Sequence, residues 1–133
     1  MLVAYDALIN LIVAVFLGGL IGIEREKNHK PAGVRTHMLV CLGACIFTIS
    51  SVSFGSDPAR IASSIVTGIG FIGAGTIIAA KEKIVGITTA ASLWTTSAIG
   101  LLVGIGEFEL AIVASFFVLL ILLLEYIVKK WIK

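Results

Sequence analysis

The chain has 133 residues, of which 59% are hydrophobic and 14% are charged, and its formal net charge is +2. A typical soluble domain carries roughly 25% charged residues, and so short a chain cannot bury this large an apolar fraction away from water. The composition therefore excludes an ordinary soluble domain and predicts an integral membrane protein within a lipid bilayer. The small positive charge gives no indication of nucleic-acid binding.

Five apolar segments, each about as long as a membrane-spanning helix, follow one another along the chain. Short clusters of charged residues separate them. The segments are Leu2–Ile23, His37–Phe54, Ala59–Ala80, Ile87–Gly106 and Leu110–Val128. We therefore expect an all-α, polytopic transmembrane helical bundle that forms one domain over residues 1–133.

The basic residues predict the orientation of this bundle. Nine of the ten Lys and Arg residues follow the first, third or fifth segment: Arg25, Lys27, Lys30, Arg35, Lys81, Lys83, Lys129, Lys130 and Lys133. Only Arg60 lies on the other side. Because basic residues favour the cytoplasmic side, we expect the N-terminus outside and the C-terminus in the cytoplasm. The first segment has no basic residues before it and no small-residue cleavage site, so we interpret it as a retained helix.

Most of the 14 glycines lie inside the apolar segments. Small residues four apart on a helix let two helix backbones approach closely. We expect helix packing, within the chain or against a second copy in a homodimer, at Gly18, Gly22, Gly68, Gly70, Gly73, Gly75, Gly100 and Gly104. Residues Gly68–Gly73 also spell the glycine pattern of dinucleotide-binding proteins, but they lie inside a membrane segment rather than after a strand. A glycine-weakened helix that exposes carbonyl groups to an ion is the functional alternative.

Polar residues inside the fourth segment follow helical spacing. Thr89, Ser92 and Thr96 share one face with Gly100, and two interpretations stay open. The hydroxyl groups either bond neighbouring helices or their own carbonyls, or they form a polar seam for a cation or proton. Trp94, in the same segment, is interpreted as a core-packing residue.

The charged residues lie at or near the segment ends. Glu24 is placed to pair with Arg25 or Arg35, and simple anchoring at the membrane interface is an equal alternative. Carboxylates are few and scattered, so the sequence permits weak magnesium contact without defining a site. Cys41 and Cys45 are interpreted as buried apolar filler, and His37 as a candidate pH sensor. No nucleophile–base set appears, so we expect neither an enzyme nor a cofactor.

Several sequence runs, in order, resemble the MgtC/SapB family of bacterial inner-membrane proteins. They are Gly18–Glu26, Ala32–His37, Arg60–Ala62, Val66–Gly75, Gly86–Trp94 and Ala98–Leu101, and the similarity extends from about Leu8 to Lys129. The resemblance implies about five spans and a link to growth in low magnesium, acid tolerance and survival in macrophages. It also implies regulation of a membrane complex, the F-type ATP synthase, rather than transport. The family-motif positions carried over are Glu24, Arg25, Arg35, Thr36, Arg60, Thr89 and Trp94.

Two departures from the family pattern affect these expectations. Many members continue into a cytoplasmic ACT-like domain, whereas this chain stops at Lys133. The virulence-type motif has Asn where this chain has Thr88, which is more similar to the general SapB-type branch. We expect a non-enzymatic inner-membrane protein that tunes magnesium or proton homeostasis under low-magnesium or acid stress. The alternative is a small magnesium or other cation transporter with its path along the third and fourth segments.

Overall fold

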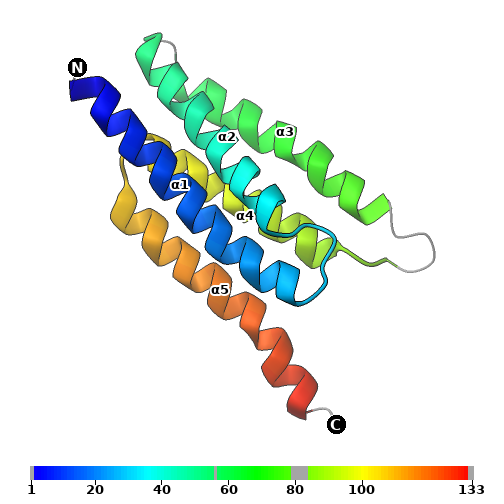
Figure 1. Cartoon of the computed structure of the whole chain (residues 1–133). Helices are drawn as coiled ribbons and strands as arrows, with labels where there is room; N and C mark the ends of the chain where they lie inside the picture. The colour runs from blue at the N-terminus through cyan, green and yellow to red at the C-terminus, as the bar shows by residue number, and fades with distance from the viewer. Residues whose placement is uncertain (1, 56, 79–83, 132–133) are drawn as a thin grey trace.

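The computed structural model describes residues 2–55, 57–78 and 84–131, and these residues form five helices (Figure 1). Their bounds are α1 Leu2–Lys27, α2 Val34–Ser53, α3 Pro58–Ile78, α4 Ile87–Gly104 and α5 Phe108–Trp131. Each is long and apolar enough to cross a membrane, and the described residues contain no strand. The prediction of an all-α, five-span bundle is therefore confirmed. The predicted end of the third span at Ala80, with its Lys81–Lys83 cluster, lies outside the described residues.

Three of the helices extend by two residues or more beyond the predicted apolar segments. Helix α1 continues from Ile23 to Lys27, α2 starts at Val34 instead of His37, and α5 starts at Phe108 and continues to Trp131. Backbone hydrogen bonds continue a helix through the polar edge of a bilayer, so a helix need not end where its apolar sequence ends. Helix α3 begins at Pro58, one residue before the predicted segment, and the Asp57 carboxylate accepts a hydrogen bond from the Ala59 amide at 3.0 Å.

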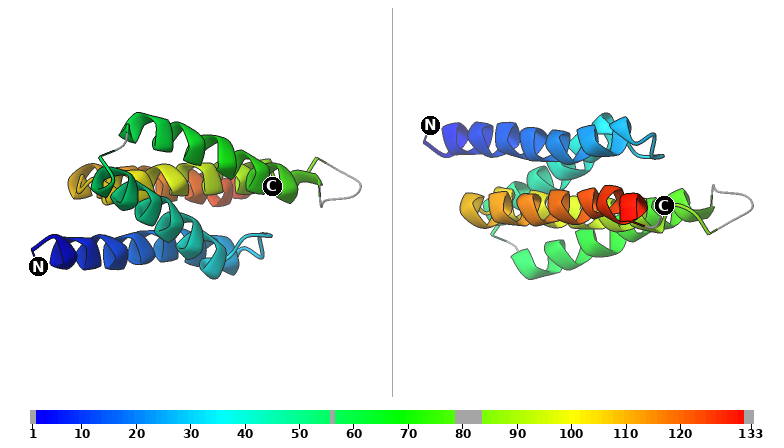
Figure 2. Two further views of the ribbon diagram at one scale, coloured as in Figure 1. Left: turned by 90° about the horizontal axis from the view of Figure 1, so that it is seen from above. Right: turned by 90° about the horizontal axis from the view of Figure 1, so that it is seen from below.

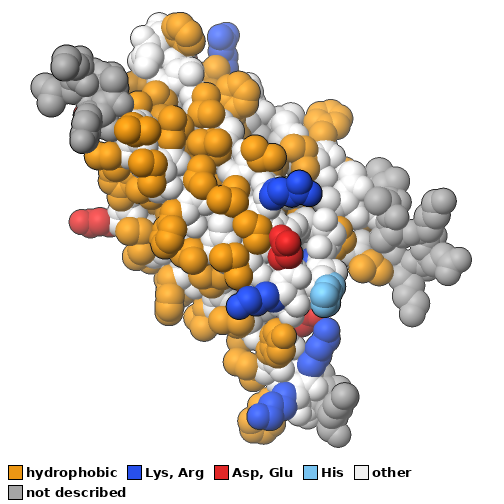
Figure 3. Space-filling view, in the orientation of Figure 1, with side chains coloured by type: hydrophobic (Ala, Val, Ile, Leu, Met, Phe, Trp, Pro, Cys, Tyr) orange, Lys and Arg blue, Asp and Glu red, His pale blue; other side chains and the backbone are white. Residues whose placement is uncertain are grey.

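Helix α4 is the centre of the bundle, because it contacts all four other helices (Figure 2). Helix α2 packs against α1 and α4 and also contacts α3, and α5 contacts α1 as well as α4. Successive helices run in opposite directions, so the ends of α1, α3 and α5 lie with the beginnings of α2 and α4 (Figure 1). In Figure 3, Lys and Arg side chains gather near the ends of α1 and α5, and apolar side chains cover the middle of the same face.

Glycines of α1 and α4 explain why α2 packs so closely against both helices. A Cβ atom on Gly18 would lie 2.7 Å from a backbone oxygen of α2, and one on Gly22 would lie 2.5 Å from the Val34 Cα. On the other side, a Cβ on Gly104 would lie 2.5 Å from a side chain of α2, and one on Gly100 would overlap a backbone oxygen of α2. A larger residue at these four positions would push the helices apart.

The glycines of α3 have different surroundings. A Cβ on Gly73 would meet Ala90 of α4 at 3.4 Å, which is ordinary contact, whereas Gly68, Gly70 and Gly75 have nothing within 4 Å. The run Gly68–Gly73 lies inside the continuous helix α3. The chain therefore has neither the strand-to-helix turn that a dinucleotide needs nor a broken helix at this point.

The core contains apolar residues from α1, α2, α4 and α5, including the two cysteines. Cys41 and Cys45 are fully buried free thiols, so their interpretation as apolar filler agrees with the structure. The core-packing interpretation of Trp94 is wrong, because its side chain is 50% exposed on the outer face of α4. Lipid is as apolar as a protein core, so an apolar residue in a membrane helix can face either.

Candidate functional site

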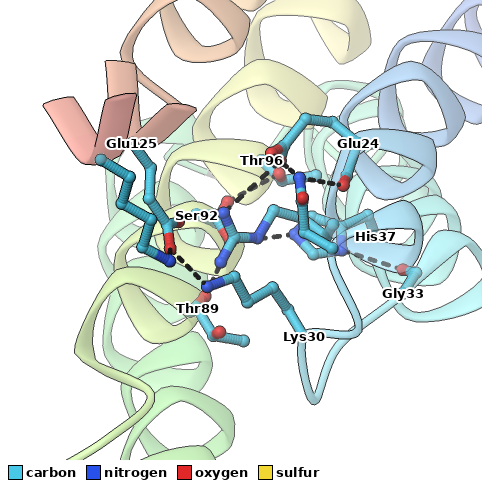
Figure 4. Close-up of polar contacts among 11 residues, drawn as sticks. Glu24, Lys30, Gly33, His37, Thr89, Ser92, Thr96 and Glu125 are labelled. Carbon is cyan, nitrogen blue, oxygen red and sulfur yellow. Dashed lines mark hydrogen bonds and ion pairs between the residues drawn. The ribbon is translucent and has the colours of Figure 1, made fainter. Parts of the chain in front are cut away.

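A cluster of buried polar and charged side chains lies where α1 ends and α2 and α4 begin (Figure 4). We call it the polar cluster. Its buried members are Glu24 and Arg25 of α1, His37 of α2, and Thr89, Ser92 and Thr96 of α4. Burying a charge is costly unless it is paired, so the contacts within the cluster decide what it can do.

Glu24 and Arg25 form an ion pair inside the bundle. The Arg25 Nη1 atom lies 3.4 Å from Glu24 Oε2, and the two side chains are 1% and 9% exposed. The other carboxylate oxygen of Glu24 accepts a hydrogen bond from Asn28 Nδ2 at 2.5 Å. Of the two partners that the sequence allowed for Glu24, the structure therefore places Arg25 beside it, and Arg35 is exposed.

The fixed positive charge of Arg25 is only partly satisfied. Its Nε atom is buried and has no hydrogen-bond partner among the described residues. An Arg side chain keeps its proton in proteins, so this charge is permanent. Arg25 and Glu24 both lie close enough to His37 to act on it electrostatically.

His37 joins α2 to α4. Its Nδ1 atom lies 2.9 Å from the Gly33 carbonyl oxygen, and its Nε2 atom lies 3.0 Å from Ser92 Oγ. A carbonyl oxygen can only accept, so Nδ1 carries a proton. In a neutral ring, Nε2 then accepts from the Ser92 hydroxyl. In a protonated ring, Nε2 donates, and the Ser92 proton is free for the Thr89 carbonyl oxygen at 2.8 Å. The hydroxyl of Ser92 can therefore follow the protonation of His37.

The remaining hydroxyl contacts of α4 stay within the helix. Thr96 Oγ1 donates to the Ser92 carbonyl at 2.7 Å, and Thr89 and Thr96 are almost completely buried. The polar face that the sequence predicted is therefore real, and its contacts are backbone carbonyls of α4 and the imidazole of α2.

A second ion pair lies beside the polar cluster. Lys30, in the loop between α1 and α2, has its Nζ atom 2.9 Å from Glu125 Oε1 of α5, and Lys129 contacts the same oxygen at 2.7 Å. Sequence reasoning missed this contact and the role of Asn28. One signal was present, because Glu125 is the one charged residue in the apolar run Leu110–Val128.

Four sequence candidates lie away from the polar cluster. Arg35, Arg60 and Trp94 are exposed, and Thr36 is partly buried. Thr36 lines an apolar groove of about 620 Å³ between α2 and α3, together with Gly43, Gly68 and residues around them. Among the residues that the structure describes, no three His, Cys, Asp or Glu side chains are placed to hold a metal ion.

The fold and the site together define a class: a multi-pass membrane protein whose helices enclose a hydrogen-bonded ion pair and a histidine at one end. The profile of the MgtC family matches residues 11–131. The chain belongs to the MgtC family.

Relatives from several bacteria share nearly half of the aligned residues. The chain is 46% identical over 127 residues to "Putative magnesium transporter YhiD" of Escherichia coli strain K12, covering 88% of this chain and 59% of that protein. It is 44% identical over 116 residues to "Protein MgtC" of Salmonella typhimurium strain LT2, covering 86% and 50%. It is 47% identical over 108 residues to "Protein MgtC" of Brucella abortus strain 2308, covering 80% and 45%. The chain thus spans about half the length of these relatives. No solved structure gives a significant match.

Proposed function

We propose that this chain is a non-enzymatic module of the bacterial inner membrane that tunes magnesium homeostasis through contact with another membrane protein or a second copy of itself. The name of the Escherichia coli relative connects the family to magnesium, and five apolar helices make the chain a multi-pass membrane protein. In the predicted orientation, the polar cluster lies at the cytoplasmic side.

The permanent charge of Arg25 is the observation that carries this proposal. A cation path along Thr89, Ser92 and Thr96 would pass His37, which bonds Ser92 and lies within electrostatic reach of Arg25. A buried guanidinium repels a cation much more strongly than it would in water. The one carboxylate of the cluster, Glu24, already contacts Arg25 and Asn28. These features favour a closed, paired interior over a magnesium channel.

Open space along α3 supports the partner contact. Gly68, Gly70 and Gly75 leave open space beside that helix, and Gly68 also lines the groove against α2. Small residues let a helix from another chain approach closely. The occupant would be a second copy or a membrane complex, such as the F-type ATP synthase that the family resemblance implies.

Magnesium flux into liposomes tests whether the interior of the bundle is closed to cations. The purified chain is reconstituted with a magnesium-sensitive dye inside the vesicles, with and without an imposed membrane potential. Thr96→Val is compared with Thr95→Val, a matched control on the same helix whose side chain is only partly buried. We expect no flux above that of protein-free vesicles for any of the three proteins.

The alternative function is magnesium transport, which the name of the Escherichia coli relative favours. It predicts flux that Thr96→Val reduces and Thr95→Val leaves unchanged. That result would move the functional site into the helix interior and would overturn the proposal.

Growth in low magnesium tests the proposed contact with a partner. Gly68→Leu fills open space on α3, whereas Val66→Leu alters an already exposed, branched residue of the same helix. In bacteria that lack their own homologue, we expect Gly68→Leu to lose the growth benefit and Val66→Leu to keep it, with both variants folded. Full benefit from a folded Gly68→Leu variant would contradict a contact at this face.

A further inference from the structure

An apolar groove of about 620 Å³ runs between α2 and α3, which lie side by side in Figure 1. Its walls include Leu39, Gly43 and Phe47 of α2 and Ile65 and Gly68 of α3. A Cβ atom on Gly43 or Gly68 would meet no other atom within 4 Å. These two glycines therefore keep the groove wide.

The walls of the groove offer few free polar groups. Ser64 Oγ donates to the Arg60 carbonyl oxygen at 3.0 Å, and Ser97 Oγ donates to the Trp94 carbonyl oxygen at 2.7 Å. Both hydroxyl groups are thus satisfied within their own helices. Ordered water needs several polar partners, and an empty groove would forfeit packing contacts. In a bilayer, we therefore expect an apolar molecule to fill this space.

The length and width of the groove suit a single acyl chain. Along α2 the lining residues extend from Thr36 to Phe47, which is about 16 Å of helix at roughly 1.5 Å per residue. This length is about half of a hydrocarbon core roughly 30 Å thick, so it matches one leaflet. A helix with its side chains is about 10 Å across, and the same length of helix would fill roughly twice the volume of the groove. A partner helix can still approach α3 at Gly70, about 200° around the helix from Gly68.

The two ends of the bundle differ in charge. At the end where α2 begins, the described chain has three acidic residues and six Lys or Arg residues: Arg25, Lys27, Lys30, Arg35, Lys129 and Lys130. At the opposite end, the described chain has Arg60 and four acidic residues: Asp6, Asp57, Glu107 and Glu109. An anionic headgroup is therefore attracted to the end where α2 begins and repelled from the other.

Arg35 stands where the groove reaches this basic end. It is exposed, precedes Thr36 in the first turn of α2, and lies four residues before Leu39, which places it on the same helix face. Helix side chains tilt toward the N-terminus, so Arg35 extends from the apolar wall toward the level of the headgroups. It forms no ion pair among the described residues. The helix start itself also favours an anion, although the Val34 amide already donates to the Glu26 carboxylate at 2.7 Å.

We propose that the groove binds one anionic phospholipid, with an acyl chain between α2 and α3 and the phosphate beside Arg35 and Thr36. An Arg side chain suits a phosphate because its planar group can donate two parallel hydrogen bonds. Arg35 and Thr36, which lie away from the polar cluster, thereby gain a role. The inference rests on this groove and its charged end, and it does not require the function proposed above.

Native mass spectrometry of the full chain, released from detergent micelles, counts bound lipids and tests the proposal. Phosphatidylglycerol and phosphatidylcholine with identical acyl chains are titrated separately, and glycerol phosphate shows whether the headgroup alone is enough. Arg35→Gln is compared with Lys130→Gln, which removes a basic charge from α5 at the same end. Gly43→Leu is compared with Gly70→Leu, which also has open space around it but does not line the groove.

We expect one phosphatidylglycerol per chain, held at least about fivefold more tightly than phosphatidylcholine, the gain typical of one basic residue beside an anionic lipid. Arg35→Gln should remove this preference, and Gly43→Leu should abolish retention of both lipids because leucine fills the groove. Lys130→Gln and Gly70→Leu should stay within about twofold of the parent, since an exposed, separate charge is screened. Circular dichroism and size-exclusion profiles confirm that each variant is folded.

Four results would each overturn the proposal. The first is equal retention of the two phospholipids, and the second is equally tight binding of glycerol phosphate. The third is full lipid retention by a folded Gly43→Leu variant. The fourth is a dimer without bound lipid that Gly43→Leu alone dissociates, because a second copy of the chain would then occupy the groove.

Discussion

Substituting Ala for Gly100 should loosen the contact between α2 and α4. The new Cβ would lie 2.8 Å from the Ala44 Cβ and would overlap the Cys41 carbonyl oxygen. Moving the Ala44 contact from 2.8 to 3.4 Å, the edge of ordinary contact, separates the helices by about 0.6 Å. The obstructing Cys41 atom belongs to the backbone and cannot turn away as a side chain would.

The magnitude follows from two opposing effects. Overpacking a well-filled interior costs about 1–3 kcal/mol, and the rigid backbone contact places this site in the upper half of that range. Ala is the better helix former by roughly 1 kcal/mol. We therefore expect Gly100→Ala to lower the free energy of unfolding by about 1–2 kcal/mol.

Gly70→Ala on α3 is the matched control. Nothing lies within 4 Å of the new Cβ, so only the gain in helix propensity remains, up to about 1 kcal/mol. The free energy of unfolding is measured by titrating SDS into mixed micelles and following circular dichroism. Equal shifts for the two variants, or a Gly100→Ala variant as stable as the parent, would refute the idea that these glycines set the helix spacing.

Three further predictions concern charges and an aromatic residue. Arg25→Gln should lower the free energy of unfolding by about 3–5 kcal/mol, because it leaves the buried Glu24 charge without its cation. Adding Glu24→Gln should recover part of this loss. Strictly additive losses in the double variant would argue against the ion pair. Glu125→Gln should lower the free energy of unfolding by less than about 1 kcal/mol, since the Lys30–Glu125 ion pair is partly exposed. The variant should still broaden the distribution of spin-label distances between the end of α5 and the α1–α2 loop. An unchanged distribution would mean that the ion pair does not hold α5 in place. Brominated lipids should quench the fluorescence of Trp94 in a Trp131→Phe background, because the Trp94 side chain is 50% exposed. Unquenched fluorescence would mean that protein covers this side chain.

Locally encoded features could be predicted from the sequence because they depend on nearby residues. The apolar segments between charge clusters determined five helices, since a bilayer accepts a helix whose backbone groups are satisfied within it. The start of α3, predicted at Ala59 and found at Pro58, was equally local. The spacing of Gly18 with Gly22, and of Gly100 with Gly104, marked faces that do lie against α2.

The contacts that make up the site depended on tertiary structure. His37 meets Ser92 across 55 residues of sequence, and Lys30 meets Glu125 across 95. Predicting such contacts requires knowing which face each helix turns toward its neighbours. In a soluble protein, the apolar stripe fixes that face, but lipid is as apolar as a protein core, so the hydrophobic pattern of a membrane helix does not separate inside from outside. For the same reason Trp94 was expected in the core and lies on the outer face. The sequence by itself determined the helices and their close glycine faces, and only the packing of the helices decided which side chains met.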